Sequence, residues 1–237
     1  MGNRKSIVII LILLGVLACS KYEIKEEHYP NGNLLAKGEL KDDKLHGVFQ
    51  EYYEEGQLKR SLNYQNGLLN GNATDYYSNG MVKRKYGYSN DTLEGPVEIF
   101  FDDGNLNKTF KYLNGKIDGD LIEYDSLGNL YTTTTYQDGV KTWFKVYHPN
   151  GKLFIDEERE GELRNGKYTV YFEDGTIDEV GEYEDGDRIG WFVRNYSNGS
   201  IKDSVLFKEG KWQIAHQYDS LGEYIISKKN LENTPNQ

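Results

Sequence analysis

Apolar and polar residues alternate along most of the chain in short runs that glycine-containing turns separate. In residues 51–59, EYYEEGQLK, an aromatic pair precedes a glycine, and a leucine follows that glycine by two positions. A closely similar pattern recurs at 75–83, DYYSNGMVK, and at 99–107, IFFDDGNLN. Alternation with a period of two between turn residues is typical of half-buried β-strands. The pattern therefore predicts short strands joined by tight turns, without helices in the body of the chain.

The glycine of this pattern recurs nine times at intervals of 23 or 24 residues. Glycine suits a tight hairpin because it adopts a positive φ without steric cost. An apolar residue usually follows two positions later and an aromatic residue eight positions later. Two and eight have the same parity, so we expect both side chains on one face of an extended strand. The nine anchor glycines are Gly32, Gly56, Gly80, Gly104, Gly128, Gly151, Gly175, Gly199 and Gly222.

A second turn signal follows the aromatic position in most repeats, as in QNG at 65–67. Each repeat thus contains two turns and two strands of about 6–8 residues. The strand that enters an anchor turn carries apolar residues three positions apart, such as Phe49 and Tyr52. This odd separation leaves two alternatives open, a β-bulge in that strand or apolar contacts on both faces. The predicted fold is all-β, an elongated single-layer antiparallel meander of about 8–9 tandem β-hairpin repeats.

The N-terminal segment has the features of an export signal. Arg4 and Lys5 precede an apolar run at 7–18, which is too short to span a bilayer and fits a signal-peptide core. VLAC at 16–19 resembles the bacterial lipobox, which implies cleavage before Cys19 and lipid on that cysteine. A plain secretory signal and an uncleaved anchor are the alternatives. Cys19 is the only cysteine, so no disulfide framework is available within the chain.

These features divide the chain into four parts. Residues 1–18 are the predicted lipoprotein signal peptide, 19–27 a short tether, 28–226 the repeat domain and 227–237 a frayed tail. The chain has a formal net charge of −10, and its basic residues are interspersed with acidic ones. Nucleic acid and anionic headgroups are therefore poor partners. We expect membrane contact through the lipid, in the cell envelope of a bacterium and at the outer membrane if the cell is Gram-negative.

The repeated phrases YYEEGQLK, YYSNGMVK and YHPNGKL, each followed by a YxNG or YxDG and a further glycine, resemble the bacterial variant of the MORN repeat. The resemblance covers residues 28–224. It implies stacked hairpins in one elongated sheet with rows of aromatic side chains. Many bacterial proteins with this repeat are labelled antitoxin-like, and others are uncharacterised lipoproteins, so the resemblance implies much less about activity than about fold.

No catalytic constellation is evident, and no G-x-S-x-G, H-E-x-x-H or Walker loop is present. We therefore expect no enzyme activity, cofactor or metal site. The four histidines are expected in surface turns, and clusters of carboxylates such as Asp102 with Asp103 and Glu173 with Asp174 in solvated turns. These carboxylates could in principle bind calcium, but their spacing is looser than calcium loops require. The histidines are His28, His46, His148 and His216.

Function is therefore sought where repeats differ from one another. IDEEREGEL at 155–163 places Arg159 at an aromatic position and shifts the turn glycine to Gly161, which predicts a bend or a functional insertion. Trp143, Trp191 and Trp212 either share an exposed binding face or pack the sheet.

Three functions are consistent with these features. The first is a non-enzymatic envelope lipoprotein whose sheet binds or scaffolds another protein. An antitoxin-like or immunity protein that masks a toxin is the alternative, and a glycan-binding module is a further one. A neighbouring toxin gene would favour the antitoxin, whereas an exposed tryptophan and tyrosine patch would favour a ligand platform.

Overall fold

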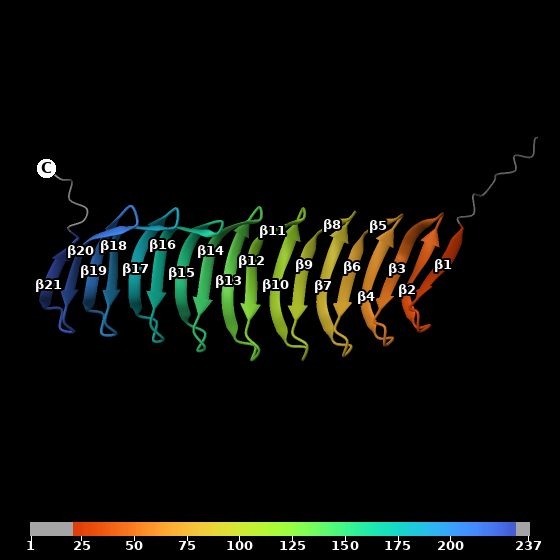
Figure 1. The fold of residues 1–237 in the computed structure, drawn as a ribbon, viewed down its shortest axis with the longest axis horizontal. Coiled ribbons are helices and arrows are strands. Elements are labelled where there is room, and N and C mark those ends of the chain that lie inside the picture. The colour runs from red at the N-terminus through yellow and green to blue at the C-terminus, as the bar shows by residue number, and fades with distance from the viewer. Residues whose placement is uncertain (1–20, 231–237) are drawn as a thin grey trace, which may run out of the picture.

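The computed structural model describes residues 21–230 as one open antiparallel β-sheet that extends along a single long axis (Figure 1). The predicted elongated single-layer meander is thereby confirmed. The described residues contain no helix long and apolar enough to cross a membrane. The strands are β1 (Tyr22–His28), β2 (Leu34–Lys41), β3 (Lys44–Tyr52), β4 (Leu58–Gln65), β5 (Leu68–Leu69), β6 (Gly71–Tyr76), β7 (Val82–Ser89), β8 (Thr92–Leu93), β9 (Gly95–Phe100), β10 (Leu106–Leu113), β11 (Lys116–Ile117), β12 (Gly119–Tyr124), β13 (Leu130–Gln137), β14 (Val140–Tyr147), β15 (Leu153–Glu160), β16 (Leu163–Tyr171), β17 (Ile177–Glu184), β18 (Asp187–Asn195), β19 (Ile201–Lys208), β20 (Lys211–Tyr218) and β21 (Tyr224–Lys229).

The strands pair in the order in which they occur along the chain, so β1 and β21 lie at opposite ends of the sheet (Figure 1). The two-residue strands β5, β8 and β11 precede β6, β9 and β12 and pair with the same neighbours as those strands. Because each repeat pairs with adjacent repeats, stability accumulates along the array and not in one closed core.

All nine anchor glycines have a positive φ, from 81° at Gly151 to 98° at Gly56. In the first anchor turn, the Gly32 amide donates to the Tyr29 carbonyl at 2.9 Å. In seven of the eight other turns, two-residue hairpin loops have positive φ at both central residues, as at Asn66 (54°) and Gly67 (90°). This is the pattern of a type I′ turn, whose twist matches that of the flanking strands.

A second feature of the anchor turns is a hydrogen bond to the next repeat. The Tyr53 hydroxyl donates to the Tyr76 carbonyl at 2.8 Å, and Tyr77 bonds to the carbonyl of Phe100 at the same distance. The second tyrosine of the recurrent YY pair therefore joins adjacent repeats. Its role is structural.

A β-bulge lies in the strand that leaves each anchor turn. In the β3–β4 hairpin, Tyr52 pairs with Leu58 whereas Glu51 pairs with Arg60, so Lys59 is the extra residue. The equivalent shift occurs in all nine anchor hairpins. Between Phe49 and Tyr52 the entering strand is regular, so its apolar residues lie on both faces, which was the second of the two alternatives. Nearer its start this strand has two extra residues, because Leu40 pairs with Leu45 whereas Gly38 pairs with Phe49.

The bulge also reverses side-chain parity between the first and later residues of the leaving strand. Leu58 consequently lies on the face of Tyr52, whereas Tyr64 packs on the opposite face against the cluster around Leu62. The expectation that positions two and eight after the anchor share a face is therefore wrong.

Buried side chains gather on one face of the sheet, which we call the packed face; we call the other the open face. Leu62, Ala73, Tyr86 and Val97 form a buried cluster across β4, β6, β7 and β9, with aromatic rings packed around it. The further buried residues of this face are Ala36, Asp75, Thr132, Thr134, Glu157, Val170, Tyr183 and Phe192.

The ends of the sheet differ from the predicted boundaries of the repeat domain, 28 and 226. β1 begins at Tyr22, within the predicted tether, and pairs with β2 along its whole length. β21 ends at Lys229, within the predicted tail. The side chains of both strands are exposed, so backbone hydrogen bonds hold them and no apolar periodicity marks them. The predicted signal peptide, Cys19 and the last seven residues lie outside the described residues.

Candidate functional site

One position of the repeat changes from aliphatic to basic residues midway along the packed face. It lies thirteen residues after the anchor glycine, near the start of the strand that follows the two-residue turn. The first four repeats place aliphatic side chains there, and the next three place cations. We call Lys141, Arg164 and Arg188 the basic row. In chain order the position holds Leu45, Leu69, Leu93, Ile117, Lys141, Arg164, Arg188 and Trp212.

The position that faces this one across the turn is mostly aromatic. Tyr64 pairs with Leu69 and Tyr88 with Leu93, and all four side chains pack against the buried cluster. The two positions together form a continuous edge of the packed face. This edge is aromatic and aliphatic in its N-terminal half and basic with aromatic neighbours in its C-terminal half.

Arg159 occupies the aromatic position of the sixth repeat and pairs with Arg164 across β15 and β16. Glu157 lies between them and is only 1% exposed. Its carboxylate accepts from Arg159 Nε at 2.7 Å and from Arg164 Nε at 2.8 Å. Two guanidinium groups therefore share one buried carboxylate. In the equivalent positions of the second repeat, the three side chains are Leu62, Tyr64 and Leu69.

This repeat keeps the ordinary hairpin shape, so the predicted bend or insertion near Arg159 is absent. β15 and β16 are joined by Gly161 and Glu162, and only Gly161 has a positive φ, 62°. A single positive φ at the first central residue is the pattern of a type II′ turn, which connects two strands as compactly as type I′. The shifted glycine therefore changes the turn type and preserves the loop length.

Arg188 is held by aromatic rings more than by carboxylates. Its guanidinium carbon lies 4.6 Å from the ring centroid of Phe192 and 5.4 Å from that of Phe207. The nearest carboxylate oxygen, on Glu179, is 3.8 Å from Nη2. Because Glu179 is half-buried, burial raises the pKa of its carboxyl despite the neighbouring Arg188. The two phenylalanine rings thus fix the plane of the Arg188 guanidinium, and its N–H donors have no carboxylate partner closer than 3.8 Å.

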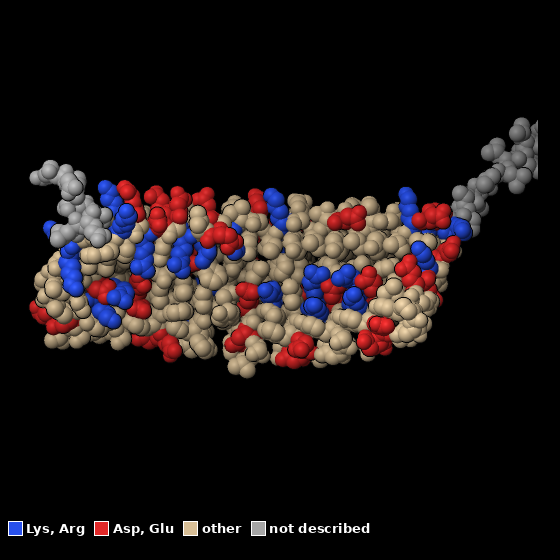
Figure 2. Space-filling view, in the orientation of Figure 1, with Lys and Arg blue, Asp and Glu red and all other residues tan. Residues whose placement is uncertain are grey.

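Two hollows open on the packed face beside the basic row. One, of about 370 Å³, is lined by Lys108, Lys141, Arg159, Tyr136 and Phe144 together with Glu123. The other, of about 280 Å³, lies between Arg188, Arg194 and the rings of Phe192 and Phe207. Figure 2 shows acidic and basic side chains side by side along the visible face of the molecule. The combination of aromatic walls and cations suits a partner with both apolar and acidic groups.

The three tryptophans do not share a face, which excludes the first of the two alternatives, a common exposed binding face. Trp191 pairs with Leu206, on the face opposite Phe192, and Trp143 pairs with Glu158, on the face opposite Phe144. Trp212 pairs with Phe207 on the packed face. Trp143 donates from its indole to Asp156, and the exposed Trp191 stacks on His216 with ring centroids 5.5 Å apart.

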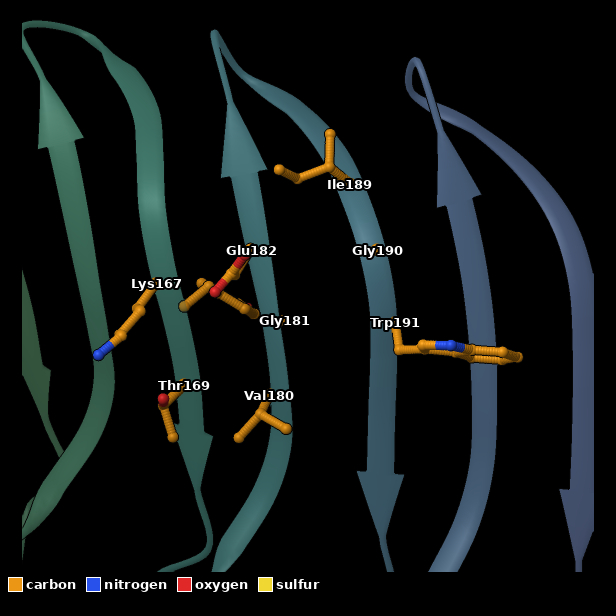
Figure 3. Close-up of a pocket in the computed structure, with 9 residues that line it drawn as sticks. Lys167, Thr169, Val180, Gly181, Glu182, Ile189, Gly190 and Trp191 are labelled. Carbon is orange, nitrogen blue, oxygen red and sulfur yellow. The ribbon is translucent and has the colours of Figure 1, made fainter.

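Trp191 also borders a hollow of about 340 Å³ on the open face. Figure 3 shows its indole directed away from Thr169 and Val180, over the next strand. The hollow is lined mainly by residues of β16 and β17, among them Lys167, Val180 and Glu182, and the indole lies at its margin.

Three histidines lie in strands and not in the expected surface turns: His28 at the end of β1, His46 in β3 and His216 in β20. His148 occupies the linking position of its repeat, where its Nε2 lies 2.9 Å from the Tyr171 carbonyl oxygen, and it is half-buried. His216 lies in β20 between Trp191 and Tyr224. Neither His148 nor His216 has a carboxylate or hydroxyl partner suited to acid–base chemistry among its described contacts.

The turn carboxylates hold backbone groups of their own turns. Asp103 accepts from the Asn105 amide at 2.9 Å, and Asp174 accepts from the Thr176 amide at 2.8 Å. The hydrogen bonds from the Thr176 hydroxyl and amide lower the pKa of Asp174. Within residues 21–230, no group of three or more histidine, cysteine or carboxylate side chains is placed to hold a metal ion.

Sequence reasoning identified Arg159 and missed the basic row. The signal was present, because an alignment of the repeats on their anchor glycines places Lys141, Arg164 and Arg188 in one column. Periodicity alone could not identify the column as exposed, since that depends on the bulges that set which face it occupies.

Comparison with solved structures returns chains that are low in identity and far longer than this one. The crystal structure of TcdB2-TccC3 is 13% identical and has a TM-score of 0.22, and the alignment covers 90% of this chain and 14% of that one. The crystal structure of TcdB2-TccC3-Cdc42 is 15% identical with a TM-score of 0.17, at the same coverage. This chain thus spans about one seventh of their length. No curated protein matches it.

Comparison with protein families gives a match at three places. The segments are residues 45–66, 69–90 and 164–185, and each matches the MORN repeat variant. The first two cover the aliphatic part of the repeat array, and the third includes Arg164 of the basic row. Three segments of this chain are therefore similar to the MORN repeat variant, and residues 21–230 form one sheet of β-hairpin repeats.

Proposed function

We propose that this chain is a non-enzymatic protein of the bacterial cell envelope that binds another protein through the packed face of its sheet. One observation carries the proposal. Lys141, Arg164 and Arg188 replace aliphatic side chains at the same position of three consecutive repeats. The fold does not need cations there, because the first four repeats form the same hairpins with leucine or isoleucine.

A protein is the partner class that this surface fits best. Arginine and aromatic side chains are enriched where proteins bind one another, because they combine apolar area with directed hydrogen bonds. Each cation of the packed face lies close to an acidic side chain, and the chain as a whole is acidic. This arrangement disfavours nucleic acid, whose binding requires a surface of one positive sign.

The anchor is the second part of the proposal. VLAC at 16–19 supports lipid attachment at Cys19, which would hold the N-terminal end of the sheet at a membrane. Cys19→Ser should abolish lipidation and move the protein from the detergent phase to the aqueous phase in a phase-partition assay. Unchanged partition of this variant would exclude the lipid anchor.

Binding is tested with the full chain immobilised in detergent and exposed to membrane extract of the source organism. Lys141→Gln/Arg188→Gln removes two charges from the packed face. Lys145→Gln/Lys167→Gln removes two charges from the open face and is the matched control. We expect the first double variant alone to lose the proteins that the unsubstituted chain captures, as measured by quantitative mass spectrometry. Equal capture by both double variants would contradict the proposal.

A further inference from the structure

We infer that the basic row receives an acidic segment in the polyproline II conformation, with a carboxylate at every third residue. This inference rests on the proposed function and names the chemistry of its partner. The segment would run across the strands along the edge of the packed face that the basic row and the positions facing it form. It is a class of sequence, defined by a three-residue period, and not a particular protein.

The first argument is spacing. Lys141, Arg164 and Arg188 are the second residues of β14, β16 and β18, so adjacent members lie two strands apart. Neighbouring strands lie about 4.8 Å apart, which places the cations about 9.6 Å apart. A polyproline II helix rises about 3.1 Å per residue and has three residues per turn, so equivalent side chains recur every ~9.3 Å on one face. Over three contacts the mismatch is about 0.6 Å.

Other peptide conformations fit this spacing less well. In an extended strand, residues three apart are about 10 Å apart but point to opposite sides of the backbone. In an α-helix, residues seven apart lie on one face at about 10.5 Å, which leaves a mismatch near 2 Å over three contacts. The polyproline II segment is therefore the conformation that presents carboxylates to all three cations at once.

The second argument is availability. Arg188 is 41% exposed and has no carboxylate closer than 3.8 Å. Lys141 pairs at 2.7 Å with Glu162, but Glu162 is 80% exposed, and such surface pairs contribute little and exchange readily. Arg164 is 39% exposed and keeps Glu157 on its inner side. All three cations can therefore donate hydrogen bonds to a carboxylate that approaches from the solvent side.

The third argument is the set of aromatic side chains that lie beside the basic row. Tyr136 pairs with Lys141 and Tyr183 with Arg188 across their turns, and Phe207, on the next strand, has its ring centroid 5.4 Å from the Arg188 guanidinium carbon. Aromatic side chains at repeat spacing form ridges, and proline-rich segments dock between such ridges because their backbone is already ordered. The same edge continues over Tyr112 and Ile117 into the N-terminal half, where the apolar residues of a longer segment could lie.

The experiment uses fluorescein-labelled peptides and the full chain in detergent micelles, with binding followed by fluorescence anisotropy in about 50 mM salt. The probe is the twelve-residue peptide (Pro-Pro-Glu)4. The composition control has the same residues with the four glutamates adjacent, and (Pro-Pro-Gln)4 is the charge control. The protein variants are Lys141→Gln/Arg188→Gln on the packed face and Lys145→Gln/Lys167→Gln on the open face.

We expect (Pro-Pro-Glu)4 to bind at least fivefold more tightly than either control peptide. Removal of one exposed contact should weaken binding up to about fivefold, so the packed-face double variant should weaken it by ten- to twentyfold. The open-face double variant should bind as the unsubstituted chain does. Equal binding of the composition control would show that net charge alone attracts the peptide and would overturn the inference.

The outcomes separate this inference from the proposed function. If no peptide binds, but the packed-face double variant still loses its captured proteins, the acidic three-residue period is wrong and the packed face remains the binding surface. If neither peptide binding nor capture depends on the packed face, both are wrong. Because the packed-face variant leaves the buried Glu157 pair intact, loss of folding should not obscure the result; circular dichroism of each variant checks this.

Discussion

Glu157→Gln tests whether the buried carboxylate holds the central repeat together. The substitution keeps the shape of the side chain and removes its charge. Glu157 accepts from Arg159 at 2.7 Å and from Arg164 at 2.8 Å, each on a different oxygen. An amide offers one acceptor oxygen and turns two N–H donors toward the other guanidinium. One arginine would therefore lose its acceptor and face a donor.

The expected cost follows from burial. Removal of one partner from a buried ion pair costs about 3–5 kcal/mol, because the remaining charge stays without compensation. Here the arginines are 18% and 39% exposed, so water compensates part of the loss. We expect a destabilisation of about 2–4 kcal/mol, a large share of the ~5–15 kcal/mol that typically stabilises a domain.

The assay is equilibrium urea unfolding followed by circular dichroism and by tryptophan fluorescence. Trp143 lies in β14, next to Glu158 of β15, so its fluorescence reports on this repeat. Glu158→Gln is the matched control, because Glu158 is adjacent in sequence and lies on the open face. If the two substitutions lower stability equally, within about 0.5 kcal/mol, the shared carboxylate does not stabilise the repeat as described.

Three further predictions concern the rest of the array. Tyr53→Phe should cost about 1 kcal/mol in urea unfolding by removing the hydroxyl bond to the Tyr76 carbonyl; no loss would show that the bond contributes nothing. Deletion of residues 72–95, one whole repeat, should leave a folded and shorter sheet by circular dichroism and small-angle scattering, whereas global unfolding would indicate a closed core. Glu179→Gln should stabilise the protein at pH 7. Burial raises the pKa of Glu179 in the folded protein, so above that pKa its ionised form lowers the free energy of unfolding. Toward pH 4 the carboxyl is protonated in both states, and the stability advantage of the variant should vanish. An advantage that stays constant with pH would refute this reason.

The sequence predicted the fold because its strongest signal, a positive φ at regular intervals, is local. Gly56 and its equivalents need no tertiary context to indicate a turn, and nine of them at a constant period indicate a repeat. Turns without glycine were harder to identify. Asp42–Asp43 and Asn90–Asp91 adopt the same pair of positive φ values, which asparagine and aspartate tolerate and which no glycine marks.

The faces of the sheet could not be predicted from parity. A single extra residue, such as Lys59, reverses the side-chain direction of everything before it in the strand, and no residue type is shared by all such positions. An extra residue in an entering strand has the same effect: Trp212 pairs with Phe207 and Ile214 with Leu206, so Gln213 is extra and Trp212 lies on the face opposite Trp191. The basic row was likewise not apparent until its face was known.

A triple substitution separates what the central repeat needs for folding from what it offers to a partner. Glu157→Leu/Arg159→Tyr/Arg164→Leu installs the side chains that Leu62, Tyr64 and Leu69 supply at the same positions of the second repeat. Replacement of a whole buried ionic group by packed apolar side chains is often neutral or stabilising by about 1–4 kcal/mol, in contrast to removal of one partner. We therefore expect this variant to unfold at the same or a higher urea concentration than the unsubstituted chain, and to bind (Pro-Pro-Glu)4 up to about fivefold more weakly. If the variant is as stable as the unsubstituted chain but binds the peptide more weakly, the cations serve binding of a partner and not folding. Marked destabilisation would mean that the packing around Phe144 and Tyr168 requires the arginines, and that the ionic cluster belongs to the fold.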